Sequence, residues 1–573
     1  MLASSLSSKT LIIFLSEIAL AYIFSYFLVM KYTNTIIYIT LSFLFSLVTI
    51  LSIIQSAEEQ SVSLLLFSTI VLSLMARSIF TLSTGLNTIP LSDSYADFAY
   101  ANFVYNTAKA PIIQGVARIE AVSQWPLLHI LTAVLSLLTR IKLIYFASSI
   151  IPLVFQVLSL SLFYISTKLL LSHRREYNNI NVILLQGIAL VIFAFFPHVI
   201  YQGIQFIRGN FGMIWIHLLL YLMLKHFYSG SIGKTSMAVL SLCLTAFVFS
   251  HHYSVGAFTI FMLSMLIMSW IQRLDRRMFS KKFMIRISVL LLISIGIWWS
   301  YYALKSFYYA SMRLSYFLAP LTYQYTRQFE RSAILSELRP IEILILVLYR
   351  DMVIYGLVGI SCIIILFRYM RARYTVRRIS TGEIILSMMI FCFLADFVIV
   401  SVLTGGADKC IAFYAPVLIG AFSYLSPQTP YLNSRKGINV VLVSLLIAGV
   451  GTFLAPYSHN YAPIYLYDCS VKHETTNSHN PRYYCVSFFL NKLVPNPVHY
   501  ISDDNDLLYA LIMPHKLQLI CDYQVCKYAY MCKHSLIIRF GSYSIHSDFW
   551  HYCDTHIEKV YSAGLPEIYI DRQ

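Results

Sequence analysis

The chain contains few charged residues. Asp, Glu, Lys and Arg make up 12% of its 573 residues, about half of the roughly 25% that is usual in soluble proteins. Hydrophobic residues make up 58%, and apolar runs of about 20 residues, each long enough to cross a bilayer as a helix, recur along most of the chain. This composition excludes an ordinary soluble protein and predicts a polytopic α-helical membrane protein.

Glycine is scarce as well, at 21 of 573 residues, against an average of about 7%. Transporters commonly consist of repeated halves whose helices are interrupted by Gly or Pro, and we find no internal repeat in this sequence. Both absences speak against a multi-spanning transporter. A transporter, or a flippase or ligase of lipid-linked glycans, nevertheless remains the alternative function.

No G-x-x-x-x-G-K-[ST] loop occurs, and the predicted cytoplasmic segments are short loops, so no nucleotide cofactor is expected. A nucleic-acid partner is also disfavoured, because such proteins carry a basic soluble face. From residue 456 onward the chain has 9 of its 42 basic and 11 of its 26 acidic residues. The basic excess therefore lies in the membrane part, where it indicates orientation and contact with anionic lipids.

Two basic loops determine the predicted topology. "RLDRRMFSKKFMIR" (273–286) and "RYMRARYTVRR" (368–378) belong in the cytoplasm. Both loops lie in the cytoplasm only if "PLLHILTAVLSLLT" (126–139) dips into the bilayer from outside without crossing it. As a helix these 14 residues would be about 21 Å long, which is short for a span. The prediction is a multi-pass plasma-membrane protein with about 13 transmembrane helices, a cytoplasmic N-terminus and an extracytoplasmic C-terminus.

The predicted spans cover about 10–30, 34–54, 61–82, 143–171, 181–201, 210–228, 236–254, 256–272, 286–304, 341–367, 383–403, 410–425 and 438–455. Residues 1–455 thus form a membrane domain with two long outer loops, 83–125 and 305–340. Residues 456–573 form a separate soluble domain outside the membrane.

This C-terminal domain alternates strand-like and helix-like pieces, which predicts a small α/β unit. The strand-like pieces are "PIYLYD", "PVHYIS", "SLIIRF" and "EIYI", and the helix-like ones are "RYYCVSFFLNKLV" and "SDFWHYCDTHIEKVYSAG". Six of the ten cysteines lie here. An even number outside the cytoplasm favours disulfides, and the absence of a C-x-x-C pair disfavours zinc.

Two carboxylates, Asp93 and Asp97, stand in the first outer loop within "IPLSDSYADFAYANFVY" (89–105). If this stretch is helical they share one face, since residues four apart are neighbours on a helix. They are either solvated capping acids or a site that takes a proton from an acceptor hydroxyl or holds a metal. His129, in "AVSQWPLLHIL", either faces these acids or is a plain interfacial histidine.

Several cations and histidines are predicted on the same outer side, where they either contact a phosphate or simply end helices. Arg208 lies at a helix end in "YQGIQFIRGNFG", and an arginine there can pair with a lipid phosphate. Lys409 follows the glycine turn "TGGAD". The remaining candidates are His251 and His252 in "FSHHYSVG" and Arg313 in the loop 305–340.

Ionisable residues also occur inside the predicted spans, where they are expensive and usually paired. They are Glu17, Arg77, Arg350, Asp351 and Asp396. We expect structural roles for them, with a pair between Arg350 and Asp396 as one arrangement.

Taken in order, these features resemble the GT-C superfamily of membrane glycosyltransferases, which includes protein O-mannosyltransferases, aminoarabinose transferases and archaeal relatives. The likeness consists of an acidic motif ("DSYAD") in the first outer loop, an aromatic-Pro entry ("WPLLHIL") into a half-buried segment, a late outer loop and a soluble outer domain after the spans. Two spans precede the helix that leads into the acidic loop, which is more than in better-known members. The WWD-type motif of oligosaccharyltransferases is absent, which argues against transfer of whole glycans to asparagine.

The resemblance implies transfer of one sugar from a polyprenyl (dolichyl) phosphate to an acceptor hydroxyl at the outer face. Asp93 or Asp97 would be the general base, and the second acid would help to bind the acceptor or a divalent metal. Arg208 and Lys409 would steady the departing phosphate, with His129, His251, His252 and Arg313 as further contacts. The acceptor, whether protein, lipid or glycan, and the sugar are left open.

Overall fold

The computed structural model describes residues 8–29, 35–84, 92–112, 122–172, 179–229, 234–271, 281–301, 303, 341–375, 380–404, 407–429 and 434–454, and four strands between 499 and 570. The chain divides into two compact units. Unit 1 comprises Met1–Ser83, Leu153–Ile204 and Gly209–Tyr465, and unit 2 comprises Thr84–Pro152, Gln205–Arg208 and Leu466–Gln573. This division does not follow the predicted boundary at 455/456, which stays a prediction.

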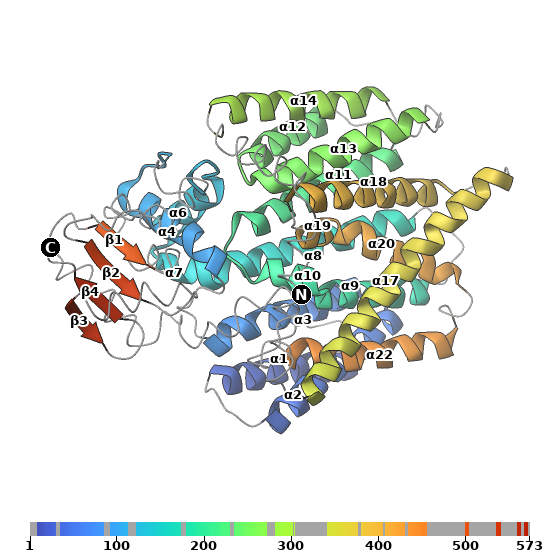
Figure 1. Ribbon diagram of the computed structural model, residues 1–573. Helices are drawn as coiled ribbons and strands as arrows, with labels where there is room; N and C mark the ends of the chain where they lie inside the picture. The colour runs from blue at the N-terminus through green and yellow to red at the C-terminus, as the bar shows by residue number, and fades with distance from the viewer. Residues whose placement is uncertain are drawn as a thin grey trace. The chain divides into compact units, whose positions relative to one another are not determined.

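All the regular secondary structure that is described before residue 455 is helical (Figure 1). Unit 1 contains α1 (Ser8–Val29), α2 (Thr35–Glu58), α3 (Val62–Thr84), α8 (Ile151–Ser172), α9 (Asn179–Phe195), α10 (Pro197–Gly203), α11 (Arg208–Ser229), α12 (Lys234–Val248), α13 (His252–Ile271), α14 (Lys281–Tyr301), α17 (Ile341–Thr375), α18 (Thr381–Thr404), α19 (Ala407–Phe413), α20 (Ala415–Leu425) and α22 (Arg435–Leu454). A few end residues of these helices belong to unit 2, namely Thr84 of α3, Ile151 and Pro152 of α8, and Arg208 of α11.

Nine helices among the described residues are long and apolar enough to cross a membrane, which agrees with the predicted multi-pass protein. They lie at Ser8–Leu28, Ile36–Glu58, Leu143–Leu171, Arg208–Tyr228, His252–Ser269, Phe283–Ser300, Ile345–Ala372, Thr381–Val400 and Arg435–Leu454. Three further predicted spans contain shorter apolar helices, Val62–Ser78, Val182–Phe195 and Met237–Val248. The remaining predicted span, 410–425, coincides with two short helices, α19 with 7 residues and α20 with 11. The number 13 therefore stays a prediction.

Small residues and hydroxyl groups hold the helices of unit 1 together. Helix α2 packs against α1, α9 and α22, and α17 packs along α22. A Cβ at Gly451 of α22 would overlap the Leu346 backbone carbonyl of α17, so glycine is required for this close approach. Such small-residue contacts are typical where apolar helices meet in a bilayer.

The buried acid Glu17 is compensated by hydroxyl donors from neighbouring helices. Ser68 Oγ donates to one carboxylate oxygen over 2.8 Å and Thr49 Oγ1 to the other over 3.2 Å. These bonds join α1, α2 and α3. The expected structural role of Glu17 agrees with this arrangement, because a buried carboxylate is tolerated only when it is hydrogen-bonded.

The suggested pair between Arg350 and Asp396 is not formed. Arg350 instead pairs with its neighbour Asp351, at 2.8 Å from Nε and 2.6 Å from Nη2 to Oδ1. Its flexible side chain folds back to the adjacent residue, which spacing arguments based on helix faces do not consider.

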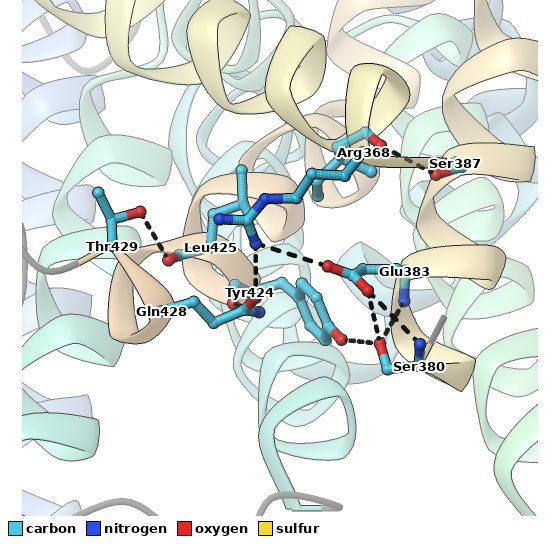
Figure 2. A network of polar contacts seen from close by, with 9 residues as sticks. Arg368, Ser380, Glu383, Ser387, Tyr424, Leu425, Gln428 and Thr429 are labelled. Carbon is cyan, nitrogen blue, oxygen red and sulfur yellow. Dashed lines mark hydrogen bonds and ion pairs between the residues drawn. The ribbon is translucent and has the colours of Figure 1, made fainter. Parts of the chain in front are cut away.

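A polar network joins α17, α18 and the end of α20, where the short 3-10 helix Ser426–Gln428 follows (Figure 2). Arg368 Nη1 donates to Gln428 Oε1 over 2.7 Å and lies 3.5 Å from Glu383 Oε1. Ser380 and Glu383 form a capping box at the start of α18, and Ser380 also bonds the Tyr424 hydroxyl. Arg368 begins the basic stretch 368–378, which was predicted to be a loop, but α17 continues through it as far as Thr375.

Unit 2 contains α4 (Ser92–Thr107), α6 (Leu127–Thr139), α7 (Leu143–Tyr145) and the π-helical turn Phe146–Ile150. Helix α6 packs on α4. It buries His129, Thr132 and Ser136 and exposes Val134, Leu137 and Leu138. Its 13 residues span about 20 Å, less than the roughly 30 Å of a hydrocarbon core. Its length and its outward apolar face fit the predicted dip into a bilayer, whose sidedness stays a prediction.

A four-stranded sheet in the order β1-β2-β4-β3 lies in the C-terminal part of unit 2. Strand β1 (His499–Ser502) pairs parallel with β2 (Ser535–Arg539), and β4 (Glu567–Ile570) pairs antiparallel with β2 and with β3 (Glu558–Ser562). Three strands fall on predicted ones, and "PIYLYD" lies outside the described residues. The α/β domain as a whole stays a prediction.

Strand β3 corrects the sequence analysis, which placed this stretch at the end of a helix. Its sequence "EKVYS" contains Val560 and Tyr561, residue types that favour strands. Pairing of Tyr561 with Ile568 on β4 decides the conformation. The six cysteines of this part lie outside the described residues, so their pairing stays open.

Candidate active site

The acidic motif "DSYAD" forms the start of a helix. Helix α4 begins at Ser92, which places Asp93 and Asp97 on one face, one turn apart. The Asp97 side chain is buried, with 4% of its surface exposed. The side chains of Ser92 and Asp93 lie outside the described residues. The sequence analysis placed the two acids on one face only if this stretch is helical, and its backbone is helical.

Asp97 is held by two partners from other elements of unit 2. His129 Nε2, on α6, lies 2.8 Å from Asp97 Oδ1. Arg208 Nε lies 2.8 Å from the same oxygen in an ion pair. The side chains of His129 and Arg208 are 0% and 12% exposed. The chain thus brings together three residues that the sequence pointed to as candidates: an acid, a histidine and a cation.

The charges in this cluster balance when the imidazole is neutral. Burial is the largest effect on His129 and lowers its pKa, and the Arg208 charge acts in the same direction, against the opposing influence of Asp97. A neutral His129 that faces a carboxylate must carry its proton on Nε2 and donate it to Oδ1. The negative Asp97 is then compensated by the single positive charge of Arg208.

Tyr100 supports the histidine and was not identified from the sequence. Its ring meets the His129 ring edge-on, with centroids 4.9 Å apart and planes at 82°. The Tyr100 hydroxyl donates to the Pro111 carbonyl over 2.8 Å, and burial raises the pKa of this hydroxyl. The signal was present, because Tyr100 follows Asp97 by three residues and so lies near it on α4.

The two oxygens of Asp97 differ in their surroundings. Oδ1 receives both the His129 bond and the Arg208 ion pair. Within the part of the chain that the structure describes, no hydrogen bond to Oδ2 is formed. A carboxylate fixed through one oxygen in this way offers the other to a substrate proton or to a metal ion.

A second group of predicted residues gathers in unit 1. His251 caps the start of α13, with Nδ1 3.1 Å from Ser254 Oγ and 3.4 Å from the Ser254 backbone nitrogen. The rings of His251 and His252 lie 4.9 Å apart. Lys409 Nζ lies 5.7 Å from the centroid of Tyr253, within cation–π range. The segment with His251 and His252 is therefore an ordered helix start with a cation beside it.

The remaining candidate is not placed. Arg313 lies outside the described residues. The Asp97 and Lys409 groups belong to different compact units, and each is described by itself. A divalent metal stays a hypothesis: in the described ranges no three metal-ligating side chains stand together.

Comparison with known proteins bears on the fold. No family model matches the sequence, and no curated protein matches it. Among solved structures, the chain is similar to ArnT from Cupriavidus metallidurans bound to undecaprenyl phosphate, with a TM-score of 0.50 and 12% identity. The match covers 89% of this chain and 97% of ArnT.

Two further structures give lower scores. The apo state of the same ArnT gives a TM-score of 0.49 at 10% identity, covering 90% of this chain and 98% of that one. The oligosaccharyltransferase from Archaeoglobus fulgidus gives 0.44 at 13% identity, covering 80% and 62%. The fold assignment depends on the first match alone.

The protein therefore belongs to the class of multi-pass helical membrane proteins. Its fold is similar to that of ArnT, over nearly the whole length of both chains. The resemblance that the sequence motifs suggested is confirmed at the level of the fold.

Proposed function

We propose that the protein transfers a sugar from a polyprenyl phosphate to an acceptor hydroxyl at the outer face of the plasma membrane. The observation that carries this proposal is the state of Asp97, whose Oδ1 is fixed by His129 and Arg208 while Oδ2 has no hydrogen bond within the described residues. The fold supports it, because ArnT of this fold has been solved with undecaprenyl phosphate bound. A donor that is itself a lipid phosphate needs no nucleotide site.

In the proposed reaction Asp97 Oδ2 takes the proton of the acceptor hydroxyl. The hydroxyl oxygen forms a bond to the anomeric carbon, and the bond from that carbon to the phosphate oxygen breaks. The electron pair leaves with the phosphate. Asp93, one turn earlier on the same helix, is the second candidate for the base, or it helps to bind the acceptor or a divalent metal.

The leaving phosphate gains negative charge, which cations placed nearby stabilise. Arg208 serves twice in this proposal: Nε holds Asp97, and the charge of the guanidinium faces the departing phosphate. Lys409, His251, His252 and Arg313 are proposed as further contacts. His129 acts as a positioning residue, because its bond to Oδ1 determines the direction of Oδ2.

The C-terminal domain is proposed to present the acceptor outside the membrane, whether protein, lipid or glycan, with the N-terminus in the cytoplasm. Asn106, an exposed residue on α4, provides a test of sidedness. An Asn106→Cys variant should react with an impermeant thiol reagent added to intact cells. Reaction only after the cells are opened would place the acids on the cytoplasmic side and contradict the proposal.

The activity itself is tested in membranes supplied with labelled polyprenyl-phosphate sugars. We expect label to move to an acceptor with the native chain and to be lost with Asp97→Asn. Asn106→Ala, on the same helix but exposed, is the matched control and should transfer at the native rate. Full turnover in both Asp93→Asn and Asp97→Asn, at normal expression, would favour the transporter or flippase instead.

A further inference from the structure

Arg77 of α3 is a cation buried inside unit 1, with 1% of its surface exposed. One edge of its guanidinium is fully used. Nη1 donates to the Ser73 carbonyl and the Ser73 hydroxyl, each over 3.0 Å, and to the Ala194 carbonyl over 3.5 Å. Gln156 Nε2 in turn donates to the Ser73 hydroxyl over 2.5 Å. Arg77 is therefore fixed in place by its own helix and by α9.

The other edge has no partner. Nε and Nη2 are buried and make no hydrogen bond within the described part of the chain, and no carboxylate there pairs with Arg77. These two nitrogens form the side of the guanidinium that binds the two oxygens of a carboxylate or phosphate in parallel. A buried cation that lacks an anion is costly in a membrane bundle. The geometry thus presents an unoccupied two-pronged donor.

Gly203, the last residue of α10, packs closely against the Arg77 side chain. A Cβ at residue 203 would lie 2.6 Å from Arg77 Nε and 3.3 Å from Gln156 Oε1, so any other residue would press on both groups. Gln156 Oε1 is also buried and makes no hydrogen bond in the described ranges. The same holds for Oε1 of Gln202, next to Gly203 in the chain.

The unpartnered atoms therefore include two donors on a cation and a neutral acceptor close to them. An ionised carboxylate would satisfy only the donors, because it has no proton to give. A singly protonated phosphate satisfies both, since its anionic oxygens accept from Arg77 and its P–OH group donates to an amide oxygen. We propose that Arg77 and Gln156, next to Gly203, form a binding site for a phosphate group.

The phosphate is either the head group of a membrane lipid or free inorganic phosphate, which share this chemistry. The site lies wholly in unit 1, uses none of the residues placed around Asp97, and does not depend on glycosyl transfer. Binding neutralises a buried charge that is otherwise uncompensated. Binding should therefore raise the free energy of unfolding. Once the ligand concentration exceeds the dissociation constant, this increase grows with the logarithm of the concentration.

The test is a thermal-unfolding titration of the purified full-length protein in uncharged detergent, at constant ionic strength. The probes are inorganic phosphate and farnesyl phosphate, with farnesol as the uncharged control. We expect a saturable rise in Tm with farnesyl phosphate and none with farnesol. Stabilisation by inorganic phosphate as well would identify the free ion as a ligand, and its absence would identify the lipid head group.

Two variants locate the binding. Arg77→Gln should raise the apparent Kd by about tenfold or more, because charge-assisted two-pronged bonds are lost. Gly203→Ala should weaken binding while keeping the charge, and it tests the site independently if Arg77→Gln does not fold. Arg140→Gln, at an exposed cation in unit 2, is the control and should bind like the native chain. The proposal is overturned if neither phosphate probe changes the Tm, or if both site variants titrate like the native chain.

Discussion

His129 Nε2 lies 2.8 Å from Asp97 Oδ1, joining two helices across 32 residues of sequence. The bond orients a buried carboxylate, and it specifies which nitrogen of the imidazole carries the proton. Arg208 reaches the same oxygen at 2.8 Å. In the proposed reaction Asp97 therefore acts through Oδ2, and the direction of Oδ2 depends on the bond from His129 to Oδ1.

Removal of the histidine should lower transfer without removing the base. We expect His129→Ala to reduce kcat by about tenfold to a hundredfold, because a misdirected base loses its alignment with the acceptor hydroxyl. His129→Gln, whose amide can still donate to Oδ1, should recover part of the rate. Steady-state transfer assays with both variants check this. An unchanged kcat in His129→Ala would show that the bond has no positioning role.

Loss of the cation should destabilise the fold around Asp97. Arg208→Gln leaves a buried carboxylate without its ion-pair partner, and breaking such a pair costs about 3 kcal/mol. Denaturation of the purified protein, compared with Arg140→Gln at an exposed position, measures this difference. Equal stability of the two variants would mean that the Arg208 ion pair contributes little in solution.

The neutral imidazole predicts a pH dependence. Because the pKa of His129 is lowered on folding, the unfolded chain binds more protons below about pH 6.5. Stability contributed by this group is therefore complete above that pH and is lost as the pH falls toward the lowered value. Unfolding measured at several pH values should show this loss in the native chain and a smaller one in His129→Gln. The difference between the two isolates the group from other histidines; parallel curves would contradict the assignment.

Much of the fold was predictable because apolar runs of about 20 residues carry a strong signal for membrane helices. The Asp97 site was partly predictable for a related reason, since an acidic motif, a tryptophan–proline entry and a lone histidine are conspicuous in a chain with so little charge. What the sequence could not give is the geometry of the cluster. It named Arg208 as a phosphate ligand, and in the structure its Nε pairs with Asp97.

The errors have local causes. Strand β3 depends on antiparallel pairing with a strand nearer the C-terminus, which helix-like patterns within one segment do not reveal. Arg350 pairs with its sequence neighbour through a flexible side chain, whereas spacing arguments consider only residues that share a helix face. The Arg77 site depends on which atoms lack partners, a property that exists only after the helices have packed.

The central claim is that Asp97 removes the acceptor proton through Oδ2. It is tested most directly by the ratio of transfer rates of Asp97→Asn and the native chain, per amount of folded protein, with a labelled polyprenyl-phosphate sugar. Asparagine keeps the shape of the side chain and cannot accept the proton, so we predict a fall of about a hundredfold or more. A variant that transfers at half the native rate or faster would contradict the account.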